Sequence, residues 1–179
     1  MKNILLYLSA FIPMYILIMI KQVIEMLIGN IKTNALNFIV LGFLFVLICL
    51  GVLGLLLEVF NKHQTTREVL IISKENITDE HFLGYFSLFV LFAITFDLSR
   101  ISMFVVFVLI LIMIGVVYVK NKLFYINPFL NILGFNFYSI TYQEKGELEN
   151  KTHIFSKSEI IPGNKYKVKI KDENFSFIA

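Results

Sequence analysis

The chain has 179 residues, of which 58% are hydrophobic and only 16% are charged. Soluble proteins average about 45–50% hydrophobic and about 25% charged residues, so this composition excludes a soluble globular enzyme and a disordered chain and leaves an integral membrane protein. The net charge of +3 lies in the tail from residue 120 onward, which has nine lysines against six acidic residues. A weakly basic tail beside a membrane is typical of the cytoplasmic face and does not by itself indicate nucleic-acid binding.

Four apolar segments are each near the roughly 20 residues that cross a bilayer. In chain order they are residues 4–26, 37–57, 81–98 and 101–119. The first is expected to be a retained helix kinked near Pro13, because no cleavage site of small residues follows it. The third segment is short, since its apolar part covers only residues 82–96. The tight turn that follows it predicts that the third and fourth segments form an antiparallel hairpin.

The distribution of lysine and arginine predicts the orientation. With four spans, the N-terminus, the 58–81 loop and the tail lie on one side, which carries six basic residues near the membrane against three on the other. We therefore expect a multi-pass protein of the bacterial inner membrane with both termini in the cytoplasm.

A small cytosolic β domain is expected in two pieces. Residues 68–73 are rich in β-branched types and read as a strand, which has no partner in its own loop. The tail offers four further strands, at residues 135–142, 152–155, 166–170 and 175–178. Residues 66–78 and 135–179 are therefore predicted to form a small SH3-like or OB-like barrel. Residues 120–134 would form an interfacial elbow in front of it, with a sharp turn at Gly134.

The sequence predicts no catalytic, cofactor or metal site, and hence no enzyme. The three histidines have no neighbours at ligand spacing, and Cys49 lies in an apolar run. Lys21 and Glu25, four residues apart, either line an ion path or lie at the interface where the first span ends. Four glycines within spans could permit close contacts between helices. They are Gly42, Gly51, Gly54 and Gly115.

The most distinctive charge pattern is Lys165-Tyr-Lys-Val-Lys-Ile-Lys171. Alternation in a strand places all four lysines on one face. We call Lys165, Lys167, Lys169 and Lys171 the lysine face. It is either the solvated outside of a barrel strand, which also discourages aggregation, or a docking face for an acidic partner, a lipid headgroup or nucleic acid.

Several of these pieces together resemble KwaA, the four-span membrane family of the Kiwa antiphage defence system. They are EVLIISKENIT at 68–78, the hairpin after it, NKLFYINPFLNILGFNFYSITY at 121–142 and the lysine-rich tail ending FSFIA. The resemblance covers about residues 60–179. It implies an oligomeric sensor of phage attack, such as a tetramer, which has no enzymatic activity and works with a cytosolic DNA-binding partner, KwaB. It assigns a role to no particular residue.

The function expected from this resemblance is a membrane sensor and recruitment platform in antiphage defence. It would detect a change in the envelope and control a cytosolic, KwaB-like effector, without contacting nucleic acid itself. Two alternatives fit the same composition. One is an immunity protein against a bacteriocin or contact-delivered toxin, and the other is a small channel subunit.

Overall fold

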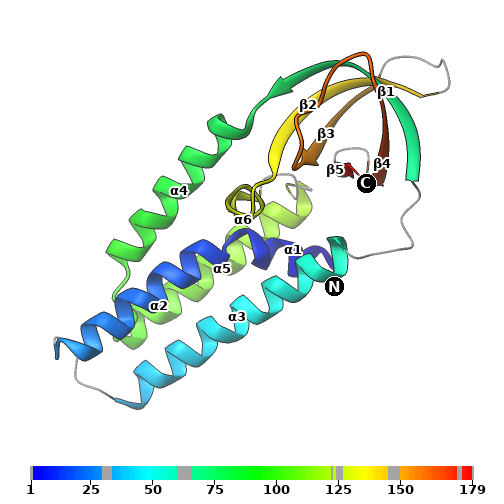
Figure 1. Ribbon diagram of the computed structural model, residues 1–179. Helices are drawn as coiled ribbons and strands as arrows, with labels where there is room; N and C mark the ends of the chain where they lie inside the picture. The colour runs from blue at the N-terminus through cyan, green and yellow to red at the C-terminus, as the bar shows by residue number, and fades with distance from the viewer. Residues whose placement is uncertain are drawn as a thin grey trace.

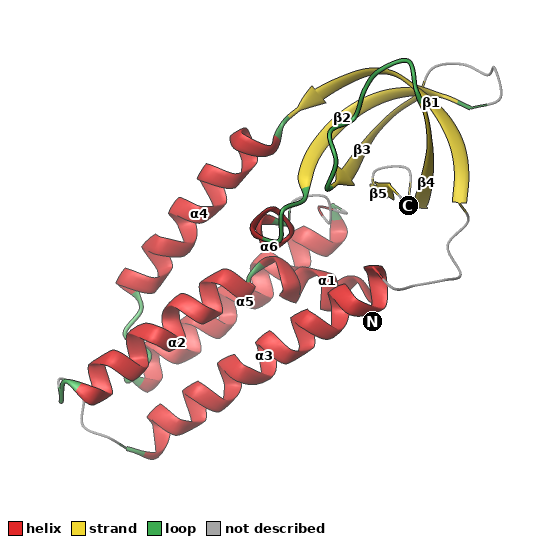
Figure 2. Ribbon diagram, in the orientation of Figure 1, coloured by secondary structure: helices red, strands yellow, loops and turns green. Residues whose placement is uncertain are grey.

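The computed structural model describes residues 2–29, 34–59, 66–121, 123, 127–144, 150–172 and 175–178, although some side chains within these ranges are not described. Long helices form one part of the molecule, and a curled β sheet forms a separate part at one end of them (Figure 1). The chain passes from the helices into the sheet, back into the helices and into the sheet again (Figure 2).

The first apolar segment forms two helices, α1 (Lys2–Ala10) and α2 (Ile12–Leu27), whose axes differ by 51°. Pro13 lies in the first turn of α2, where its missing N–H costs no helical hydrogen bond. The kink expected near Pro13 is therefore confirmed. The break between the two helices falls at Phe11, where the backbone leaves helical geometry.

Among the described residues, two helices are long and apolar enough to cross a membrane, α3 (Ala35–Val59) and α5 (Ile101–Lys120). The bent pair α1–α2 makes a third if it counts as one span. The helix α4 (Thr78–Thr95) fills the position of the predicted third span, but it opens with Thr-Asp-Glu-His and its long apolar part begins only at Phe86. The predicted count of four spans is therefore not confirmed, whereas two or three candidate spans are present.

Close helix contacts are made at three of the four glycines predicted to permit them. A Cβ atom at Gly54 would lie 2.6 Å from the backbone oxygen of Leu5, and one at Gly51 would lie 3.0 Å from Ser9. These two glycines let α1 pack directly on the backbone of α3. Gly115 lets the ring of Tyr7 approach α5, whereas Gly42 faces open space.

The five strands form a closed barrel with the order β1-β2-β3-β5-β4. Their bounds are β1 (Thr66–Asn76), β2 (Asn136–Gln143), β3 (Asn150–Ser156), β4 (Lys165–Asp172) and β5 (Phe175–Ile178). Among the strands that the structure describes, only β3 and β5 pair in parallel. The strand predicted in the 58–81 loop is confirmed as β1, and it pairs antiparallel with β2 on one side and with β4 on the other.

The barrel has its own small core, built by alternate, inward-facing residues of its strands and by Ile160 from the loop between β3 and β4. Seven buried residues form it: Val69, Ile71, Tyr138, Ile140, Ile154, Ile160 and Val168. A bulge interrupts the register of β1 and β2 between Ile71 and Ser73, which helps a sheet of few strands to curl. The turn after Ile160 binds β1 at this point, because Gly163 donates its N–H to the carbonyl of Ile71 at 2.8 Å. Gly163 has φ +86°, a conformation that favours glycine.

Candidate coupling site between the helices and the barrel

The chain enters the barrel from α5 through one short helix, α6 (Pro128–Ile132). Asn127 begins this helix, because its side-chain oxygen accepts a hydrogen bond from the backbone N–H of Phe129 at 3.1 Å. Gly134 ends it with φ +83°. The sharp turn expected at Gly134 is thus confirmed, and it directs the chain into β2.

A buried polar contact ties α6 to the first helix. The side-chain amide of Asn127 donates to the hydroxyl of Ser9 at 2.8 Å, and that hydroxyl donates to the carbonyl of Leu6 at 2.7 Å. Ser9 is 0% exposed and Asn127 is 4% exposed. A buried polar group without a partner is costly. This contact therefore fixes the position of the start of α6 against α1, close to the bend between α1 and α2.

A second contact ties the start of α4 to the start of β2. The backbone N–H of Phe137 donates to the hydroxyl of Thr78 at 2.8 Å, and this hydroxyl lies 3.2 Å from the carbonyl of Phe137, to which it can donate. The backbone N–H of Ile77 also donates to that carbonyl at 3.1 Å. The first turn of α4 is therefore attached to the strand that follows α6.

The packing continues from the helices into one end of the barrel. Leu130 of α6 and Phe137 and Phe155 of the barrel belong to the same buried cluster as the core of the helices. The rings of Phe137 and Phe155 lie 4.9 Å apart. A shift of α6 would therefore act on β2 directly and on β3 through the contact between Phe137 and Phe155.

The connectivity reinforces this coupling. Neighbouring strands β1 and β2 are joined through α4, α5 and α6 in turn, and Asn76 at the end of β1 pairs with Tyr138 near the start of β2. Both ends of this helical insertion thus attach to adjacent strands at one end of the barrel (Figure 1). Any change in the angle of the helices relative to the barrel would strain this junction.

The lysine face is placed on β4, beside β1. Lys165 and Lys167 are exposed, whereas Val168 between two lysines is buried, as the predicted alternation requires. Lys167 is paired in register with Glu68 of β1. The backbones of Lys169 and Lys171 continue the strand, but their side chains lie outside the described residues.

A nearby ion pair connects the turn before β4 to β1. Lys74 Nζ lies 2.7 Å from Glu159 Oε1. The hydrogen bond from Lys74, helped by its positive charge, lowers the pKa of the Glu159 carboxyl below its ordinary value.

Lys21 and Glu25 lie at the end of the bundle away from the barrel. The Lys21 ammonium is 3.9 Å from the Glu25 carboxylate and donates to the carbonyls of Ile94 and Phe96 at 3.2 and 3.1 Å. A lysine at the last carbonyls of a helix stabilises its C-terminus. These contacts join the last part of α2 to the end of α4.

The remaining reactive groups are scattered. Within the described residues, no three His, Cys, Asp or Glu side chains lie close enough to hold a metal ion. Cys49 is exposed on α3, and His153 stacks on Phe137 with 5.4 Å between the rings. His63 lies outside the described residues, as does the side chain of His81.

Sequence reasoning alone did not single out Ser9, Thr78 or Asn127. The available signals were a serine within an apolar span, a threonine opening a helix, and an Asn-Pro pair, which commonly begins a helix. These signals mark each local feature, but they do not reveal which distant residue it contacts.

The chain combines apolar helices of membrane-spanning length with a β barrel. This architecture is that of a membrane-associated protein. The model of the family described as "Anti-phage protein KwaA" matches residues 2–177, so the chain belongs to the KwaA family. The predicted resemblance is thereby confirmed and extends over the first two apolar segments as well. Searches of curated proteins and of solved structures found no match.

Proposed function

We propose that this protein is a membrane sensor and recruitment platform in antiphage defence. It detects a perturbation of the envelope through its helices and controls a cytosolic, KwaB-like DNA-binding effector through its barrel. The observation that carries the proposal is the junction at α6 and Thr78. Because α4, α5 and α6 are inserted between two paired strands, a change in the helices has a direct route to the barrel.

The proposal includes a topology of four spans in the bacterial inner membrane, with both termini and the barrel in the cytoplasm. In this topology α3 and α5 are two of the four spans, the bent pair α1–α2 is a third, and α4 is the fourth. The excess of basic residues on the barrel side supports this orientation. The contacts of Lys21 with the carbonyls at the far end of α4 support a placement of the ends of α2 and α4 at the same membrane surface. A shortened α4 would be accommodated by local thinning of the bilayer.

Five strands closed into one barrel with a parallel β3–β5 pair favour the OB-like of the two expected folds. We propose that the lysine face on its outside meets an acidic surface of the effector. Exposed ion pairs each contribute only about 0–1 kcal/mol, so four lysines would mainly speed encounter and set orientation. We also propose that the protein has no enzymatic activity and assembles with copies of itself, for example as a tetramer.

The experiment that tests the function is an affinity pull-down from membranes before and after phage adsorption, with the retained protein identified by mass spectrometry. We expect a DNA-binding protein encoded beside this gene to be retained, in an amount that changes on adsorption. Retention of a toxin would favour the immunity alternative. Ion flux through the purified protein in liposomes would favour the channel alternative.

A further inference from the structure

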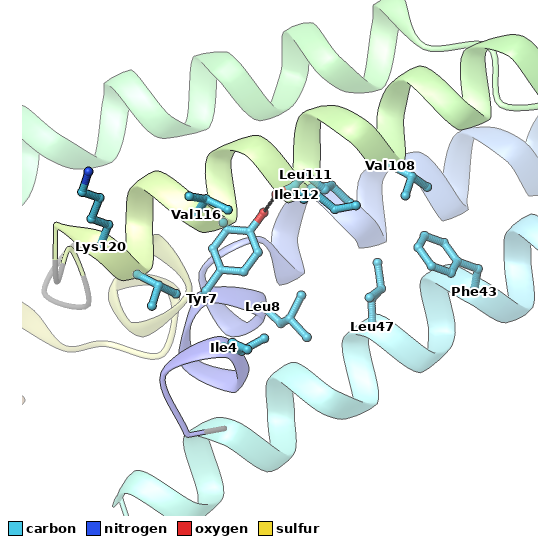
Figure 3. A pocket seen from close by; sticks show the side chains of 12 residues that line it. Ile4, Tyr7, Leu8, Phe43, Leu47, Val108, Leu111, Ile112, Val116 and Lys120 are labelled. Atoms are coloured by element: carbon cyan, nitrogen blue, oxygen red, sulfur yellow. Dashed lines mark hydrogen bonds between the residues drawn. The ribbon is translucent and has the colours of Figure 1, made fainter.

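An apolar groove runs between α3 and α5 on the side of the bundle where α1 lies. Its volume is about 650 Å³, within the range of ligand-binding cavities in proteins. Figure 3 shows α1 contributing Tyr7, α3 contributing Leu47, and α5 forming the opposite wall from Val108 to Lys120. None of the helices in the structure fills this space.

The lining of the groove predicts a hydrocarbon occupant. The surface that it presents is apolar. The hydroxyl of Tyr7 lies at the floor of the groove, but it already donates a hydrogen bond to the backbone carbonyl of Leu111 at 2.5 Å (Figure 3). A polar ligand would therefore find no group inside to bind, whereas an alkyl chain would lose no hydrogen bond with water.

The shape of the groove favours a lipid chain over a helix from a second copy. Phe43 of α3 and Phe104 of α5 meet edge-to-face, with 5.4 Å between their rings, and so join the two walls at the end away from the barrel. From Val108 to Lys120 the α5 wall is about 18 Å long, at about 1.5 Å per residue. This length is close to half of the roughly 30 Å hydrocarbon core. A spanning helix would need twice that length, but an acyl chain of one leaflet would not.

The mouth of the groove carries a cation. Lys120 ends α5 on the barrel side, and the side chain is exposed while lining the groove. Among the described residues, no acidic side chain pairs with it. A lysine at this depth is suited to a lipid phosphate, because long basic side chains extend to the headgroup level.

We infer that the groove binds one anionic phospholipid from the barrel-side leaflet, with an acyl chain between α3 and α5 and its phosphate at Lys120. This inference rests on the proposed placement of the protein in the membrane. The lipid would then contact α1 and α5, the helices on either side of the coupling site. The lipid composition of the membrane would thus affect the state of the proposed sensor.

The test is native mass spectrometry of the purified full-length protein in detergent, supplied with phosphatidylglycerol and phosphatidylcholine. Val116 lines the groove, and the adjacent Val117 does not, although the two side chains are 61% and 52% exposed. Val116→Trp fills the groove, and Val117→Trp is the matched control. Lys120→Gln removes the headgroup contact and leaves the hydrocarbon site in place.

We expect the native protein and Val117→Trp to retain one phosphatidylglycerol per chain, and Val116→Trp to retain at least tenfold less. Lys120→Gln should lower the preference for phosphatidylglycerol by about fivefold, the effect of one basic residue near a membrane surface. Equal retention by both tryptophan variants would overturn the lipid site. So would a Val116→Trp protein that keeps its lipid but changes its number of subunits, because a second copy would then occupy the groove.

Circular dichroism of each variant checks that its helices are intact. An unchanged lipid preference in Lys120→Gln would overturn the assignment of the phosphate. Because this assay uses neither phage nor effector, it can fail while the recruitment proposal stands, and the reverse is equally possible.

Discussion

Replacing Thr78 with valine should loosen the junction between α4 and the barrel without changing its shape. Valine is nearly the same size as threonine but lacks the hydroxyl, so the variant loses both hydrogen bonds to the backbone of Phe137. Each such bond contributes about 0.5–1.5 kcal/mol net, which gives a loss of about 2 kcal/mol at this position. In a chain of this length, that loss lowers the melting temperature by roughly 4–8 °C.

Amide hydrogen exchange measures this loss where it occurs. The amide of Phe137 donates directly to Thr78, and about 2 kcal/mol corresponds to roughly thirtyfold faster exchange if the amide exchanges by local opening. Thr78→Ser is the matched control, because it keeps the hydroxyl and should exchange nearly as slowly as the native protein. Equal exchange rates in the valine and serine variants would refute the reasoning, because the hydroxyl would then contribute nothing to the junction.

Three further predictions concern other parts of the molecule. Changing the four residues of the lysine face to glutamate should leave membrane insertion intact but abolish effector binding and reduce phage protection; retained binding at ordinary salt would assign recruitment to another surface. Gly54→Ala should destabilise the protein by about 1–3 kcal/mol through overpacking, because its Cβ would lie 2.6 Å from the α1 backbone. Gly42→Ala, where the Cβ would face open space, should leave the stability unchanged, and thermal unfolding of both variants measures the difference. The pKa of Glu159, lowered by Lys74, should return toward its ordinary value in Lys74→Gln when followed by NMR. Because the folded-state pKa is the lower one, the pair stabilises the protein at neutral pH, and this stabilisation is lost as the pH falls through the carboxyl's range.

The barrel was predictable because its strands carry local signals. Residues 166–170 alternate charged and apolar types, and the Pro162-Gly163-Asn164 turn precedes them, so the strand assignment needed no distant information. The pairing of residues 68–73 with the tail followed from the rule that a lone strand needs partners. The closed order of the five strands did not follow, because several orders satisfy the same pattern.

The junction and the groove could not be predicted in the same way. Ser9 and Asn127 are 118 positions apart, and neither residue indicates which group it contacts. The groove is lined by three helices that are distant in the sequence, and one of them, α1, approaches α3 closely at Gly51 and Gly54. The contact of Thr78 at the start of α4 with β2 is likewise absent from any local pattern, because its partner Phe137 lies 59 positions further along the chain.

The most direct test of coupling is the amount of effector held on membranes across phage adsorption, compared between the native protein and Thr78→Val at equal membrane levels. The account predicts that adsorption changes the retained amount for the native protein. With Thr78→Val the change on adsorption should be smaller, because the variant loses two of the hydrogen bonds that join α4 to the barrel. An identical response in the two proteins would contradict the claim that the helices control the barrel through this junction.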